Sequence, residues 1–416
     1  MVQDSSGITL AARQWGGAEL RDAARARATA QDMRRNMAGK RAIFEEVGSG
    51  QGRGQAVAKP AGGMIDAPAQ GARGAIRIWL MVIFALVAVM IAVGGLTRLT
   101  DSGLSITEWN PVMGALPPLG TAAWASEYAK YQASPQGQIM NAAMTLDGFK
   151  QIYWWEWGHR ELGRVIGLVW ALGFGFFALT RRVPAGWSVR FLALGLLIGM
   201  QGAIGWLMVS SGLKGTMTSV ASYWLALHLA GAFVIFGLIS WWVLLLGRSE
   251  TDLLVARRNG ERRLYGLSTG VMHWLFWQIV LGALVAGIDA GRNYPTWPDM
   301  NGDFLPQDAF VGPFWQNAGL VQFAHRMSGY GLFAFGVMAW WRGRASAYRA
   351  TRGAFNMMLA MLLVQVVLGI YTALSAAQLH MAITHQVGAV VLWVLVIRAR
   401  HMAVYPVQGS IREGTA

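Results

Sequence analysis

The stretch Glu156–Gly163 reads EWGHRELG, and a second stretch, Gln322–Gly329, reads QFAHRMSG. In both, a His-Arg pair is followed by a Gly three residues after the Arg, and both lie at the start of a long apolar segment. A pattern that recurs so far apart in one chain indicates that a structural unit is used twice.

Apolar segments long enough to cross a bilayer occur throughout the chain after residue 75. A spanning helix needs about 20 mostly apolar residues, and only 13% of the 416 residues are charged, about half the share found in soluble domains. We therefore expect an all-α polytopic membrane protein. Its eight transmembrane helices should begin near Ile78, Gly158, Arg190, Tyr223, Leu267, Leu320, Ala354 and Gln378.

Further landmarks recur in the same order along the chain. The third and seventh segments share Gln-x-x-x-Gly, at Gln201 and Gln365, and the fourth and eighth share a His, at His228 and His385. Each repeated unit then holds four spans, and an even number makes the two repeats parallel. The eight helices are predicted to form two four-helix bundles in the same orientation.

Arg and Lys mark one side of the membrane, because cytoplasmic flanks collect them. Most of the 35 such residues fall before the first span, in the connections that follow even-numbered spans, and near the C-terminus. Both termini are therefore predicted to be cytoplasmic. The net charge of +14 is interpreted as a signal of topology, with the lipid bilayer as partner and no nucleic acid.

The predicted organisation has five parts. Residues 1–75, rich in Ala, Gly and Arg, form a poorly ordered cytoplasmic extension. Residues 76–247 form the N-terminal four-helix half, 248–265 a cytoplasmic linker, 266–400 the C-terminal half, and 401–416 a cytoplasmic tail. The alternative for the extension, a mitochondrial transit peptide, is disfavoured because such peptides are poor in acidic residues.

Four of the seven His residues occupy equivalent places in the two halves: His159, His228, His325 and His385. Polar groups inside a membrane usually face a bundle interior, and neutral imidazole is a common axial ligand of haem iron. The absence of Cys argues against thiolate metal sites and covalent haem attachment. We predict two haem-iron sites, each with a pair of His ligands. Simple hydrogen bonding to neighbouring helices is the alternative.

The halves differ in one residue beside these histidines. Glu156 lies three residues before His159, on the same face of a helix, whereas the equivalent residue before His325 is Gln322. An acid beside a ligand can accept a proton or stabilise positive charge. The N-terminal half is thus predicted to carry out the chemistry and the C-terminal half to store electrons. An ion pair between Glu156 and Arg160 is the alternative.

Arg160 and Arg326 each follow a predicted ligand directly. A guanidinium at this place could bind haem propionates through charge-assisted hydrogen bonds. Equally, the two side chains could extend from the helix ends toward water.

These residues resemble the haem A synthase family, and the resemblance runs from about Arg77 to Arg400. Besides the two His-Arg stretches, it rests on GGLTRLT at 94–100, SGLS at 102–105 and WNP at 109–111. Because the chain lacks Cys, it is similar to the Cys-free branch of proteobacteria and mitochondria. The expected location is the bacterial inner (plasma) membrane, with the mitochondrial inner membrane as the alternative.

The resemblance implies an enzyme that oxidises the C8 methyl of haem O to a formyl group, giving haem A. It implies that His325 and His385 hold a haem b cofactor, that His159 and His228 bracket the substrate haem, and that Glu156 is the catalytic acid. A haem O synthase would be the substrate donor. The electron acceptor is unidentified, and a homo-oligomer stays open.

Two other functions compete with this one. A non-catalytic di-haem b-type cytochrome would hold both haems permanently and need no Glu156. A transporter with parallel repeats would show charged residues or broken helices at mid-membrane, whereas the ionisable residues here cluster at the outer ends of the spans.

Overall fold

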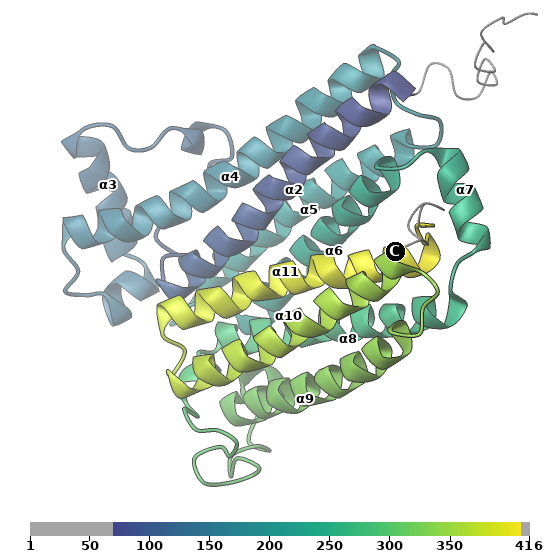
Figure 1. The fold of residues 1–416 in the computed structure, drawn as a ribbon. Coiled ribbons are helices and arrows are strands. Elements are labelled where there is room, and N and C mark those ends of the chain that lie inside the picture. The colour runs from purple at the N-terminus through teal and green to yellow at the C-terminus, as the bar shows by residue number, and fades with distance from the viewer. Residues whose placement is uncertain (1–69, 409–416) are drawn as a thin grey trace, which may run out of the picture. The chain divides into compact units, whose positions relative to one another are not determined.

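The computed structural model describes residues 70–408 (Figure 1). Within this range the chain is helical, and its only bridge of β type joins Met300 to Asp303. The prediction of a poorly ordered segment at residues 1–75 falls almost wholly outside the described residues, as does half of the predicted tail.

Eight helices in the described range are 25 residues or longer. Seven of them are long and apolar enough to cross a membrane, which confirms a multi-pass helical membrane protein. The eight are α2 (Gln70–Leu99), α4 (Leu146–Leu179), α5 (Ser188–Gly212), α6 (Ser222–Leu246), α8 (Arg262–Gly287), α9 (Ala318–Gly343), α10 (Arg349–Leu374) and α11 (Leu379–Val404). The helix that does not meet the apolarity requirement is α9. That α9 also crosses the membrane therefore stays a prediction.

The start of α4 differs from the prediction. The helix begins at Leu146, well before Gly158, where the side chain of Thr145 accepts a hydrogen bond from the Gly148 amide and caps the first turn. The added turns pack Phe149 and Tyr153 against Tyr131 of α3 (Thr121–Gln132). The apolarity of the sequence did not predict these first turns of α4, because aromatic contacts with a separate short helix stabilise them.

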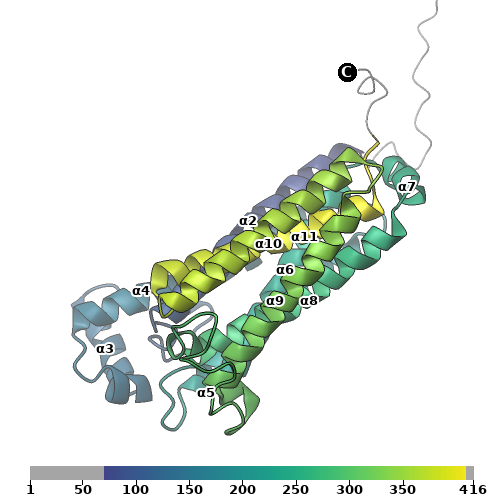
Figure 2. The ribbon, with the colours of Figure 1, turned by 60° about the horizontal axis from the view of Figure 1, so that its bottom comes forward.

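The long helices lie side by side (Figures 1 and 2). We describe α2, α4, α5 and α6 as the first group and α8, α9, α10 and α11 as the second. In the first group, α2 and α5 each contact α4 and α6. In the second, α8 and α10 each contact α9 and α11. The histidine-bearing helices, α4 with α6 and α9 with α11, therefore lie on opposite corners of their groups.

The two groups meet along α2 and α6 on one side and α8 and α11 on the other. One apolar core runs through this contact and includes Phe233 and Ile239 of α6 together with Trp393 of α11. Trp393 meets Phe233 edge to face, with ring centroids 6.0 Å apart. Close packing of this kind holds the groups together, and within the helices Gln386 Nε2 of α11 also donates to the Ile91 carbonyl of α2 at 2.6 Å.

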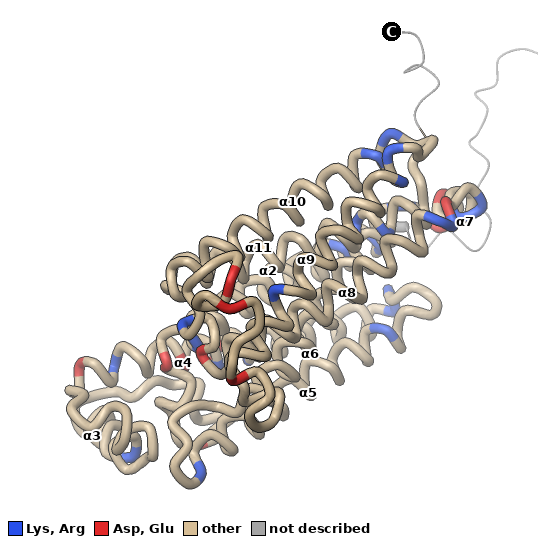
Figure 3. The backbone as a smooth tube through the Cα atoms, turned by 90° about the horizontal axis from the view of Figure 1, so that it is seen from below, with Lys and Arg blue, Asp and Glu red and all other residues tan. Residues whose placement is uncertain are grey.

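Charge separates along the helix axes (Figure 3). Lys and Arg gather around α7 (Glu250–Arg258) and the neighbouring helix ends. Acidic residues are more frequent at the opposite end. His228, His325 and His385 lie near the N-terminal ends of their helices, whereas His159 lies further into α4, which begins at Leu146. The orientation of these two ends across a membrane stays a prediction.

Candidate functional site

The imidazoles of His325 and His385 face each other inside the second helix group. Their ring centroids are 6.5 Å apart and their planes are perpendicular. A ring nitrogen lies about 1.2 Å from its centroid and binds a metal at about 2.0–2.1 Å, so two imidazoles on one metal ion have centroids roughly 6.5 Å apart. The spacing therefore fits two axial ligands of one iron.

No third ligand joins this pair. Among the described residues, no group of three or more His, Cys, Asp or Glu could hold a metal ion. Zinc and di-iron sites need such a group. A metal that takes its other ligands from a macrocycle, as haem iron does, suits two opposed imidazoles.

His159 and His228 occupy matching places in the first group. All four imidazoles lie against a glycine of the preceding long helix. A β-carbon added at that glycine would come within 2.8 to 3.3 Å of the ring Cε1. The pairs are Gly94 with His159, Gly205 with His228, Gly282 with His325, and Gly369 with His385. These glycines make room for the rings and fix their depth.

In the sequence, two of these glycines stand out only as repeat landmarks, Gly94 only as the first residue of the GGLTRLT stretch, and Gly282 was not predicted. Gly205 and Gly369 end the Gln-x-x-x-Gly pattern of the third and seventh spans. The fifth span carries the same pattern at Gln278 and Gly282. A search for that pattern in every span preceding a His would have found it.

The Glu156 carboxylate is buried, with its side chain 4% exposed, and every contact it makes is with a donor. Oε2 accepts hydrogen bonds from Ser105 Oγ and from the Ile106 amide, both at 2.8 Å. Oε1 accepts from Arg160 Nη2 at 2.6 Å and from Nε at 3.1 Å. The ion pair with Arg160, named above as the alternative role for Glu156, is therefore present. Charge-assisted bonds of this kind are strong, so the carboxylate is held in place one helical turn from His159.

The guanidinium groups of Arg160 and Arg326 both contact the loop that follows the preceding long helix. Arg160 donates to the carbonyls of Ile106 and Glu108 at 2.9 and 3.1 Å. Arg326 donates to the carbonyls of Tyr294 and Asp299 at 2.7 and 2.8 Å. Each arginine thus ties the loop after the preceding long helix to the turn that carries the neighbouring histidine. Contact with haem propionates stays a prediction.

The position equivalent to Glu156 is occupied by Gln322, which is also buried. No residue of the described range hydrogen-bonds to its Oε1. The second group therefore keeps the Arg-to-loop contact of the first but not its carboxylate. At this position the surroundings of the two histidine pairs differ by one charge.

Fold and site define a multi-pass helical membrane protein with two pairs of inward-facing histidines. A family described as cytochrome oxidase assembly protein (COX15-CtaA) matches residues 77–397. The protein named haem A synthase from Cereibacter sphaeroides strain ATCC 17029 is 60% identical over 390 residues, covering 90% of this chain and 99% of its own length. Haem A synthase from Paracoccus denitrificans is 56% identical over 378 residues, with 90% and 98% covered.

The identity to these relatives is high over nearly their whole length. The chain therefore belongs to the haem A synthase family, as its resemblance predicted.

Proposed function

We propose that this protein is a haem A synthase, which oxidises the C8 methyl of haem O to a formyl group. The family membership supports the reaction class. The observation that carries the proposal is the difference between the halves: a buried carboxylate, Glu156, beside one histidine pair, and a neutral amide, Gln322, beside the other. A protein that only passed electrons would need no such difference.

In this proposal the chain crosses the membrane eight times as two parallel repeats. The equivalent helix contacts of the two groups support the repeat. His325 and His385 hold a haem b cofactor, and their 6.5 Å separation supports this role. His159 and His228 bracket the substrate haem. When bound, haem b supplies one-electron redox chemistry and carries electrons away from the substrate.

Glu156 acts in this scheme as a fixed negative charge. Its four donors hold the carboxylate at a defined place, so it stabilises positive charge that develops at the substrate methyl. Arg160 closes the loop at 105–108 over the pocket, which keeps that charge away from bulk water. Replacing Glu156 would therefore slow the oxidation of the methyl group more than it weakens haem binding.

The setting of the reaction follows from the same proposal. The protein lies in the bacterial inner membrane with both termini in the cytoplasm, and the Arg-rich helix ends around α7 support this orientation. A haem O synthase supplies the substrate. The product, haem A, goes to terminal oxidases.

Co-expression of the full chain with a haem O synthase, followed by chromatography of extracted haems, tests the function. We expect haem A to accumulate together with haem b. If the purified protein contained haem b alone, at two per chain, and made no haem A, it would instead be a di-haem cytochrome.

A further inference from the structure

Three of the four histidines have a glutamine amide beside them, and the fourth does not. Gln201, Gln278 and Gln365 each lie four residues before the glycine that receives an imidazole. In α2 the same place, four residues before Gly94, is occupied by Met90. The exception concerns His159, the histidine next to Glu156.

Two of the three amides contact both the imidazole and the backbone of their histidine, and the third contacts only the backbone. Gln278 Nε2 lies 3.1 Å from His325 Nδ1 and donates to the His325 carbonyl at 2.8 Å. With its amide turned to satisfy its neighbours, Gln201 makes the same two contacts with His228, both at 3.0 Å. Gln365 donates to the carbonyl of His385 at 3.3 Å, while His385 Nδ1 itself has no partner within residues 70–408.

Met90 fills the same space as these glutamines. Gln278 packs on Gly329, four residues after His325, with Nε2 3.2 Å from a β-carbon placed there. Met90 packs in the same way on Gly163, four residues after His159, with Cε at 3.4 Å. A thioether donates no hydrogen bond and accepts only weakly. His159 Nδ1 is buried without a partner in the described part of the chain, as His385 Nδ1 is, but beside His159 there is no amide that could supply one.

An amide next to a ligand histidine sets the strength of ligation. When Nε2 binds iron, Nδ1 carries the proton, and an acceptor on that proton orients the ring and raises its basicity. A turn of the Gln278 amide would present Oε1, which lacks a partner among the described residues, to His325 Nδ1. Losing such a partner typically weakens metal binding by about 10–100-fold.

We propose that Met90 makes His159 the weak, exchangeable ligand of its pocket. The inference rests on the proposed function, in which this pocket exchanges its haem in every turnover. His228, held by Gln201, anchors the substrate haem. His159, which has only Met90 beside its Nδ1, releases the iron first. Met90 is thus a positioning residue that distinguishes the two histidines of the substrate pocket.

A reciprocal exchange of side chains tests this. Full-length protein loaded with haem is purified as wild type, Met90→Gln and Gln278→Met, and haem transfer to excess apomyoglobin is followed by absorbance. We expect M90Q to slow the fast phase of transfer about 10-fold or more. We expect Q278M to speed the slow phase, which belongs to haem b. M90Q should also increase the low-spin ferric signal in electron paramagnetic resonance, because His159 then stays bound.

Met90→Leu is the matched control, since it keeps an apolar chain of similar size and should keep the fast phase. A fast phase unchanged in M90Q would overturn the proposal, as would equal slowing by M90L, which would assign the effect to packing. If M90Q did not accumulate, an unchanged slow phase in Q278M would also overturn it. Haem A production upon co-expression is measured separately, so failure of the proposed function would show there even where the transfer rates behave as expected.

Discussion

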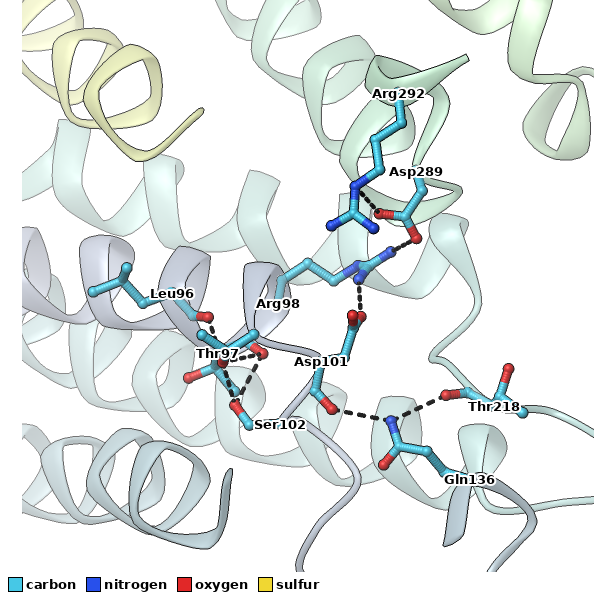
Figure 4. Close-up of polar contacts among 10 residues, drawn as sticks. Leu96, Thr97, Arg98, Asp101, Ser102, Gln136, Thr218, Asp289 and Arg292 are labelled. Atoms are coloured by element: carbon cyan, nitrogen blue, oxygen red, sulfur yellow. Dashed lines mark hydrogen bonds and ion pairs between the residues drawn. The ribbon is translucent and has the colours of Figure 1, made fainter. Parts of the chain in front are cut away.

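Arg98, at the end of α2, donates from Nη2 to a carboxylate oxygen of Asp289 at 2.7 Å, across 191 residues of chain (Figure 4). Its Nη1 donates to Asp101, also at 2.7 Å. Asp101 and Asp289 occupy matching places after α2 and α8, and both adopt left-handed backbone with φ of 53°. Ala286 takes the place of Arg98 in the second group. Arg98 therefore joins the turn after α2 to the turn after α8. The second group has no equivalent arginine.

This bridge should stabilise the contact between the two helix groups. The Arg98 side chain is 11% exposed, whereas that of Asp289 is 44% exposed, so solvent weakens the pair and we expect a coupling of about 1 kcal/mol. The measurement is a double-mutant cycle with Arg98→Gln and Asp289→Asn, read as resistance to proteolysis or unfolding in detergent. Arg292→Ala is the control, because Arg292 lies 3.9 Å from Asp289 and is half exposed. Additive effects of the two changes would show that the bridge contributes nothing.

Glu156→Gln should lower haem A production by about 100-fold or more while leaving haem content unchanged. The amide keeps a hydrogen-bond acceptor for Ser105 and Ile106 but removes the charge that the reaction uses. Production is measured by extracting haems from cells that also express a haem O synthase, and haem content by the spectrum of the purified protein.

Ser105→Ala serves as the graded companion to this change. It removes one of the four donors to the carboxylate and preserves its charge, so a loss of only a few-fold is expected. Full activity in the Glu156→Gln protein would rule out a role for the negative charge.

Alanine at the histidine-receiving glycines should reduce haem binding in the order of the contacts. A β-carbon would approach the ring of His159 to 2.8 Å at Gly94, that of His325 to 3.1 Å at Gly282, and that of His385 to 3.3 Å at Gly369. Gly94→Ala should thus be the most damaging. Haem content per chain, measured by pyridine haemochrome spectra, reports the effect.

Gly167→Ala in α4 is the matched control, because a β-carbon there meets nothing within 4 Å and alanine favours helix by about 1 kcal/mol. It should bind haem normally. If the alanine variants at Gly94, Gly205, Gly282 and Gly369 all kept full haem content, these glycines would not position the rings.

The orientation can be checked with reporter fusions. Alkaline phosphatase, which is active only outside the cytoplasm, should be active when fused after Gly215, between α5 and α6, and inactive after Gly186, between α4 and α5. Green fluorescent protein at the C-terminus should fluoresce, since the Arg-rich ends are expected to face the cytoplasm. The reverse pattern would overturn the predicted topology.

Much of this protein is determined by local sequence. Runs of about 20 apolar residues must form helices in a bilayer, because only internal hydrogen bonds satisfy the backbone there, and seven of the expected spans meet that requirement. The recurring His-Arg pattern marked the histidine positions for the same reason: a polar group in such a run is costly and needs a partner. Glu156 stood out because its counterpart is Gln322.

Only the tertiary structure decided what each of these residues touches. The four donors around Glu156 come partly from a loop some 50 residues away, and no helical periodicity reports such contacts. The extension of α4 to Leu146 depends on aromatic packing with α3. Likewise, Met90 is equivalent to the glutamines because Met90 packs on Gly163 as Gln278 packs on Gly329, which only the structure shows. Side-chain partners depend on the distances between packed helices, and those distances are set by the whole bundle rather than by any one segment.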